Sequence, residues 1–230
     1  MFIPAMRRPK AIVLISGGMD SLVTTAIASR EYEVCGLHLN YRHRTEKREL
    51  KAFKDICRYY GIERTLVADI SYLSRIGGSA LTDRAIKVPH AKPGPGKKIP
   101  ATYVPFRNTH LIAIAVSWAE VVGAKAVFIG AVEEDSSGYP DCREIYYKAY
   151  NKLIKLGTRP ETSIRIETPL IHLKKSGIVR KGISLKVPFE LSWSCYSNND
   201  AACGVCESCG LRLKGFRMAG ALDPVKYKKR

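Results

Sequence analysis

The chain has 230 residues, enough to bury a substantial core, and its size favours one domain with a small appendage. No apolar run reaches the roughly 20 residues that a bilayer-spanning helix needs, and the first ten residues lack the pattern of a signal peptide, so we expect a cytoplasmic protein without a membrane partner. The net charge of +17 raises the question of a polyanionic partner, but lysine and arginine are spread along the chain. This spacing favours a solubilising role over nucleic-acid binding.

Residues 11–30 (AIVLISGGMDSLVTTAIASR) predict a buried strand, a tight turn and an amphipathic helix that starts beyond Asp20 and Ser21. Adjacent glycines let the backbone approach a ligand, and the start of a helix offers unpaired N–H groups, so the turn is a candidate anion cradle. It is no Walker A loop, because the required lysine is missing. An ordinary tight turn is the competing interpretation. Asp20 would either brace the loop or help to position a metal ion.

Alternating strands and helices continue along the chain. The expected elements are strands 34–40, 64–69, 125–131 and 163–168, and helices 45–60, 106–122, 144–156 and 172–182. The helix at 45–60 is expected to be capped by Thr45 and ended by Gly61. This order predicts a doubly wound parallel α/β sheet of five strands, in which ligands bind beyond the carboxyl ends of the strands.

Residues 70–102 break the alternation, with a glycine- and proline-rich run at 92–98. A connection of this length predicts a lid or binding loop, whose lysines and His90 would suit closure over phosphate, although His90 alone is more typical of an ordinary loop histidine.

Four cysteines near the C-terminus predict a metal site with the spacing C-x7-C-x2-C-x2-C. They are Cys195, Cys203, Cys206 and Cys209. Four thiolates in a reducing compartment suit structural Zn²⁺. An iron–sulfur cluster is the rival, although the ferredoxin spacing is absent, and redox catalysis is a lesser alternative.

Four stretches together resemble a known enzyme family. They are SGGMDS (16–21), YVPFRN (103–108), GYPDCR (138–143) and WSCYSNNDAACGVCESCGLRLKGF (193–216). The first is similar to the pyrophosphate loop of the N-type ATP pyrophosphatases. The set resembles the 7-cyano-7-deazaguanine (preQ0) synthase family of that superfamily, which serves queuosine or archaeosine biosynthesis. Residues 70–100 match least clearly.

The resemblance implies an adenine nucleotide α-hydrolase-like domain at 1–187 and a zinc-binding C-terminal segment at 188–230 packed on it. It implies ATP, Mg²⁺ and Zn²⁺ as cofactors and a homodimer. The implied reaction converts 7-carboxy-7-deazaguanine and ammonia into the nitrile, through an adenylated carboxylate, the amide and an adenylated amide.

The same resemblance and the implied chemistry suggest roles for individual residues. Pyrophosphate would contact Ser16, Gly17, Gly18, Asp20 and Ser21. Adenosine would contact Leu37 and His38. Phosphate would contact Arg107 and Lys175, and the deazapurine would contact Asn108, Tyr139, Asp141 and Arg143.

In these roles, the Asp141 carboxylate accepts from the guanine-like edge and Arg143 holds the carboxylate of the substrate bidentately. Arg107 and Asn108 could instead bind the carboxyl or form a helix-start packing motif. A solvated helix lysine is the alternative for Lys175, and Cys142 is either a small residue or a covalent nucleophile.

Two other functions remain open from the sequence. A tRNA-thiolating ATP pyrophosphatase of the same superfamily would suit the positive charge, yet no separate tRNA-binding domain stands out. A non-catalytic zinc-ribbon protein that binds nucleic acid would leave the ATP loop unexplained.

Overall fold

The structure is a computed structural model that describes residues 8–90, 99–133 and 138–228. Its centre is one sheet of five parallel strands in the order β3–β2–β1–β4–β5. The strands are β1 (Lys10–Leu14), β2 (Glu33–Asn40), β3 (Thr65–Asp69), β4 (Ala126–Ile129) and β5 (Arg165–Glu167). The chain first builds outward from β1 through β2 to β3, then returns to the other side of β1 with β4. The strand order therefore reverses between β1 and β4, where α/β sheets open a crevice for ligands.

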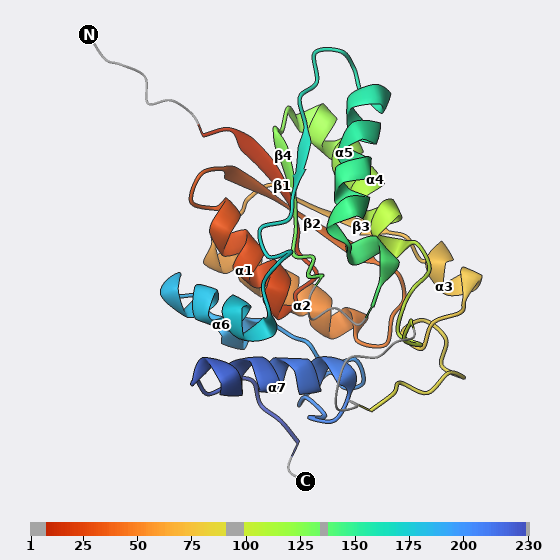
Figure 1. Cartoon of the computed structure of the whole chain (residues 1–230), viewed down its shortest axis with the longest axis vertical. Coiled ribbons are helices and arrows are strands. Elements are labelled where there is room, and N and C mark those ends of the chain that lie inside the picture. The colour runs from red at the N-terminus through yellow and green to blue at the C-terminus, as the bar shows by residue number, and fades with distance from the viewer. Residues whose placement is uncertain (1–7, 91–98, 134–137, 229–230) are drawn as a thin grey trace.

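Helices cover both faces of the sheet, as Figure 1 shows. They are α1 (Met19–Ala28), α2 (Glu46–Tyr59), α3 (Tyr72–Ile76), α4 (Arg107–Val122), α5 (Glu144–Gly157), α6 (Lys175–Ser184) and α7 (Glu207–Ala219). Short 3₁₀ turns lie at Pro140–Cys142 and Phe189–Leu191. The predicted doubly wound parallel α/β sheet is confirmed.

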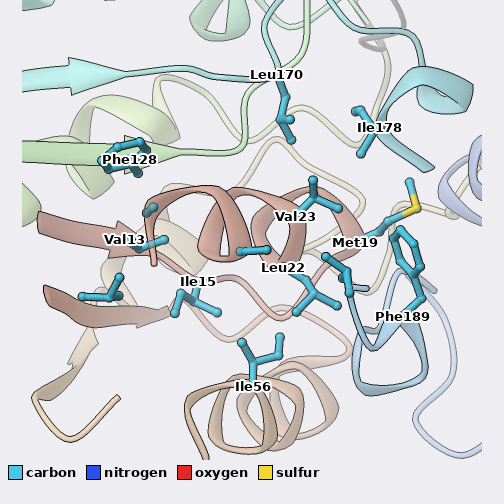
Figure 2. Packing of buried hydrophobic residues seen from close by; sticks show 14 of the residues in the cluster. Val13, Ile15, Met19, Leu22, Val23, Ile56, Phe128, Leu170, Ile178 and Phe189 are labelled. Carbon is cyan, nitrogen blue, oxygen red and sulfur yellow. The ribbon is translucent and has the colours of Figure 1, made fainter. Parts of the chain in front are cut away.

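Strand β1 supplies both hydrophobic cores because its successive side chains point to opposite faces of the sheet. Val13 and Ile15 join a cluster with α1, α2 and α6, whereas Ile12 and Leu14 join a second cluster with α4 and α5. Figure 2 shows the first cluster, in which α1 lies between the sheet and neighbouring helices. Burial on both faces explains why this strand reads as a continuous apolar run.

Several element boundaries differ from those expected. Helix α1 begins at Met19, so Asp20 lies in its first turn rather than before it. Thr45 precedes α2 but makes no capping bond to the backbone; its hydroxyl donates instead to Glu49 Oε1 at 2.8 Å. Helix α6 begins at Lys175, later than expected, because Lys174 is still extended.

Two helices were not expected from the sequence. The short helix α3 lies inside the 70–102 connection, and α7 begins within the cysteine segment, directly after Cys206. The lysines of the predicted lid at 92–98 lie outside the described residues, and His90 is exposed and pairs through its backbone with Cys206. Within the described part of the chain, no helix has both the length and the apolar character needed to cross a bilayer.

Replacement of Leu22 by alanine should lower the free energy of unfolding by about 2–5 kcal/mol, because a fully buried side chain of the first cluster leaves a cavity. The measurement is urea unfolding of the metal-loaded protein. Leu156→Ala is the matched control, since Leu156 is 84% exposed on α5. Equal effects of the two variants would contradict this description of the core.

Candidate active site

The turn between β1 and α1 has a backbone that only glycine accepts comfortably. Gly17 has φ of +89°, and a Cβ there would come within 2.7 Å of the Glu49 carbonyl oxygen. The Ser16 hydroxyl accepts the N–H of Gly18 at 3.2 Å, and Ser21 Oγ donates to the Gly18 carbonyl at 2.9 Å. The turn is thus fixed by its own hydroxyl groups, and the first N–H groups of α1 follow directly. This is the geometry of an anion cradle.

Asp20 is joined to a residue far away in the sequence. Its Oδ2 lies 2.5 Å from Lys175 Nζ at the start of α6, and its Oδ1 is buried without a hydrogen-bond partner among the described residues. Two glycines permit this approach. A Cβ on Gly130 would come within 2.9 Å of the Asp20 carbonyl carbon, and one on Gly215 of α7 would lie 2.9 Å from Lys175 Cβ.

A cavity of about 270 Å³ opens beyond the carboxyl ends of β1, β2 and β4. All four recognised stretches contribute to its wall, which includes Ser16, Gly18, Asp20, Ser21, Leu37, His38, Arg107, Asn108, Tyr139, Cys142, Trp193, Ser194 and Tyr196. A smaller adjoining lobe of about 160 Å³ adds Lys175. The structure therefore brings together most of the predicted site residues.

Two predicted substrate residues do not line the cavity, although Asp141 Oδ1 is buried without a hydrogen-bond partner among the described residues. The Asp141 side chain is buried, and its Oδ2 accepts the N–H of Asn108 at 2.9 Å, while the Asn108 side chain donates to the Asp141 carbonyl. Arg143 is exposed just before α5. Neither residue lines the cavity or its lobe. The pairing of Asn108 with Asp141 holds the beginning of α4, which matches the helix-start alternative, although Asn108 also reaches the cavity wall.

The cavity also has wall residues that the sequence alone did not reveal. They lie between the end of β2 and the first turn of α2 and include Tyr41, His43, Arg44, Thr45 and Glu49. The carboxyl end of a parallel strand was already expected to face the ligand, so the segment after Asn40 carried the signal that could have found them.

Two of these additional residues, His43 and Thr45, contact the carboxylate of Glu49. Glu49 Oε2 lies 3.0 Å from His43 Nε2, and Thr45 donates to the other oxygen. Burial opposes ionisation of Glu49, but His43 and Thr45 outweigh it and lower its pKa. Burial lowers the pKa of His38, whose Nδ1 pairs with the Ile15 carbonyl, so the ring is neutral at pH 7.

Cys142 lines the cavity with a protonated thiol. Burial, reinforced by the neighbouring Asp141 carboxylate, raises its pKa to about 11. A nucleophilic cysteine needs a thiolate near neutral pH, which positive surroundings usually stabilise. The raised pKa of the Cys142 thiol therefore favours its interpretation as a small wall residue.

The four C-terminal cysteines converge on one point. Their sulfur atoms all lie within 4.8 Å of one another. The backbone N–H groups of Ser197, Asn198 and Cys203 donate to Cys195 Sγ at 3.3–3.4 Å, and Cys209 lies in the first turn of α7. Donors and the positive end of a helix both stabilise thiolates, so this group can hold a metal ion.

A buried arginine connects this cysteine segment to the cavity wall. Arg212 of α7 pairs bidentately with Asp223 at 2.8 and 3.0 Å and donates to the hydroxyls of Ser192 and Ser194. Since Ser194 lines the cavity, α7 supports one side of the site.

Comparison with known proteins places the chain in a family. Residues 10–220 match the family described as queuosine biosynthesis protein QueC. The 7-cyano-7-deazaguanine synthase of Chloroherpeton thalassium is 60% identical over 220 residues, which cover 95% of this chain and 97% of that protein. The enzyme of the same name from Chlorobium chlorochromatii is 57% identical over 222 residues, with 96% and 97% covered. The chain belongs to this family.

This confirms the family predicted from the four stretches, and with it the prediction of an enzyme of the 7-cyano-7-deazaguanine synthase family.

Among solved structures, the chain is also similar to NMN synthetase from Francisella tularensis, at 15% identity and a TM-score of 0.45, with 80% of this chain and 63% of that chain covered. The NH3-dependent NAD synthetase from Campylobacter jejuni gives 14% identity and a TM-score of 0.47, with 82% and 68% covered.

Replacement of Cys203 by serine should abolish tight metal binding and lower the melting temperature, because a hydroxyl is a poor substitute for a thiolate ligand. Metal content per chain, measured by elemental analysis alongside thermal melting, checks this. Cys57→Ala is the matched control, because Cys57 is buried in the first core and lies outside the four-cysteine group. Full metal content in the Cys203 variant would contradict the assignment.

Proposed function

We propose that the protein converts 7-carboxy-7-deazaguanine and ammonia to 7-cyano-7-deazaguanine in two ATP-dependent steps. In the first, the substrate carboxylate attacks the α-phosphate and pyrophosphate leaves; ammonia then displaces AMP to give the amide. In the second, the amide oxygen attacks another ATP, pyrophosphate leaves again, and loss of AMP and a proton gives the nitrile. The observation that carries the proposal is that all four recognised stretches meet on one cavity.

The loop at 16–21 suits the departing pyrophosphate. Negative charge grows on the leaving group in both steps, and fixed donors aimed at that charge lower the barrier. The first N–H groups of α1 are such donors, and the Ser16 and Ser21 hydroxyls hold the turn that presents them. Lys175, held beside Asp20, supplies a positive charge at the same end of the cavity. Leu37 and His38, on the wall at the end of β2, are positioned to contact adenosine.

Mg²⁺ fits this end of the site. Asp20 Oδ1 is a buried carboxylate oxygen without a partner among the described residues, and Mg²⁺ is typically bound by one or two carboxylates together with phosphates. The ion would be held by Asp20 and would neutralise charge on the phosphates. Asp20 then has two roles, with Oδ2 bracing the loop through Lys175 and Oδ1 available to the cation.

Zn²⁺ fits the four cysteines. Zinc–sulfur bonds of about 2.3 Å place tetrahedral thiolates roughly 3.8 Å apart, and the four sulfurs here lie within 4.8 Å of one another. A multi-iron cluster would hold its thiolates further apart because the core of iron and sulfide lies between them. The spacing of the four sulfur atoms thus supports a single structural ion. The four cysteines are connected to the cavity wall by α7 and the 193–196 segment.

The proposed setting of the enzyme follows the family resemblance. We place it in the cytoplasm as a homodimer that acts on small molecules, with an ATP-binding α/β domain at 1–187 and a zinc-binding segment at 188–230. The packing of α7 against α6 supports a segment that sits on the domain rather than apart from it.

The test is incubation of the zinc-loaded protein with ATP, Mg²⁺, ammonium and 7-carboxy-7-deazaguanine, followed by mass spectrometry for the amide and the nitrile. AMP release without RNA present is expected. A folded, metal-loaded protein that forms neither product would overturn the proposal, and adenylation of tRNA instead would favour the thiolating alternative.

Gly17→Ala should raise the KM for ATP by about tenfold or more, because the new methyl group meets the Glu49 carbonyl and distorts the cradle. Steady-state kinetics at varied ATP concentration check this. Gly123→Ala is the matched control, since Gly123 also has a left-handed backbone, at φ of +69°, but has open space around it. A similar KM change in both variants would show that backbone strain alone is responsible.

A further inference from the structure

The larger cavity and its smaller lobe share a middle section. Residues that line both include Asp20, Arg107, Tyr139, Cys142, Ser194 and Tyr196. The larger cavity extends from there along Ser16 and the end of β2, where ATP is proposed to bind. A second substrate that attacks the α-phosphate must therefore lie against this shared section.

Most positive side chains on the two walls already have internal partners. Arg44 donates from Nε and Nη2 to backbone carbonyls within residues 80–86, at 2.8–3.2 Å. Arg212 is held by Asp223 and by the serine hydroxyls of the 192–194 segment. Lys175 pairs with Asp20. Arg44 and Arg212 thus serve contacts within the protein, and Lys175 is already assigned to the proposed pyrophosphate end of the site.

Arg107 differs from them. Its guanidinium makes one hydrogen bond to the described residues, from Nη1 to the Tyr41 hydroxyl at 3.2 Å, and its Nε is buried without a partner. Burial disfavours the charge of this side chain, and the neighbouring Asp141 carboxylate favours it without a hydrogen bond to it among the described residues. A guanidinium has five N–H donors and cannot be deprotonated in a protein, so the donors that remain suit an anionic ligand. Arg107 is the first residue of α4, and it follows Phe106, whose left-handed φ of +57° sets the direction in which the helix begins.

The surroundings of Arg107 suit a flat aromatic ligand. The Arg107 guanidinium lies 5.6 Å from the centre of the Tyr41 ring, and the rings of Tyr139 and Tyr196 form part of the same wall. Burial raises the pKa of Tyr41 to about 12 and that of Tyr196 well above its usual value. Their hydroxyls are therefore neutral at pH 7 and do not repel a bound anion.

We propose that Arg107 binds the carboxylate of the aromatic acid substrate and so determines the specificity of the first ATP-dependent step. This inference rests on the proposed function and names the subsite of its acid substrate. Arg143 is exposed and outside both walls, so the geometry assigns the carboxylate to the arginine of YVPFRN rather than to that of GYPDCR.

The two steps of the reaction separate this role from phosphate binding. The substrate of the first step carries a carboxylate, whereas the amide consumed in the second step is neutral. Both steps use ATP in the same way. Loss of a residue that binds the carboxylate lowers kcat/KM for the acid alone. Loss of a residue that binds phosphate lowers kcat/KM for the acid and the amide equally.

The experiment supplies the acid and the amide separately to Arg107→Gln and measures kcat/KM for each with saturating ATP and Mg²⁺. We expect a loss of about 30- to 100-fold with the acid, the range of a charge-assisted bidentate pair, and a change of no more than about threefold with the amide. Arg107→Lys should recover part of the loss with the acid, because it keeps the charge but loses the fork. The KM for ATP in the amide reaction should stay near that of the unmodified protein.

Arg58→Gln is the matched control for removal of an arginine charge, since Arg58 is 79% exposed on α2 and pairs only with Asp55 among the described residues. Equal losses of Arg107→Gln with acid and amide would overturn the inference in favour of phosphate binding. Selective loss in Arg143→Gln, with none in Arg107→Gln, would also overturn it. If Arg107→Gln unfolds, Arg107→Lys replaces it in the test. A lower ratio of kcat/KM for the acid to kcat/KM for the amide supports the inference, and an unchanged ratio overturns it. Failure of the unmodified protein with both substrates would instead overturn the proposed function itself.

Discussion

The hydrogen bond from the Trp193 N–H to the Gly17 carbonyl, 2.8 Å long, joins the first βα turn to the C-terminal segment. Around this bond, Gly17 lies against the backbone of α2, and Trp193 packs in the same small cluster as three of the four cysteines. The proposed ATP loop thus lies between α2 and the segment at Trp193, which packs against the cysteines. Neither end of the chain forms the cavity alone.

Several charged side chains of the wall pair with other groups of the protein. Glu49 Oε2 lies beside His43 Nε2, Asp20 pairs with Lys175, and Arg212 pairs with Asp223. Buried charges require such partners, and groups left incomplete in a buried site are candidates for ligand contact. Among the described residues, the buried atoms left without a hydrogen-bond partner include Asp20 Oδ1, His38 Nε2, Asp141 Oδ1 and Arg107 Nε. Asp20 and Arg107 are the two to which we assign the proposed phosphate and substrate sides of the site.

The parts of the fold that were predictable from the sequence follow local rules. The continuous apolar runs gave the parallel strands, and SGGMDS gave the turn because glycine and hydroxyl side chains act within a few residues of one another. The pairing of Asp20 with Lys175 spans 155 residues, so no local pattern could reveal it. Asp141 was predicted to contact the ligand because of its valence, and this stays a prediction. The additional bond of its Oδ2 to the Asn108 N–H depends on where α4 begins, after the left-handed Phe106, which no local pattern indicates. Helix α7 was not predicted because the cysteine spacing indicated a metal site and no secondary structure.

Helix α7 begins within the four-cysteine group, and its Gly215 allows α7 to lie directly on Lys175. One rigid element therefore contacts both the metal group and the partner of Asp20. Linkage between two sites is reciprocal: if the metal ion orders the nucleotide loop through α7, a bound nucleotide must tighten the metal by the same factor. The metal affinity of the four-cysteine group would then depend on whether a nucleotide occupies the cavity, although the group itself has no open position for substrate.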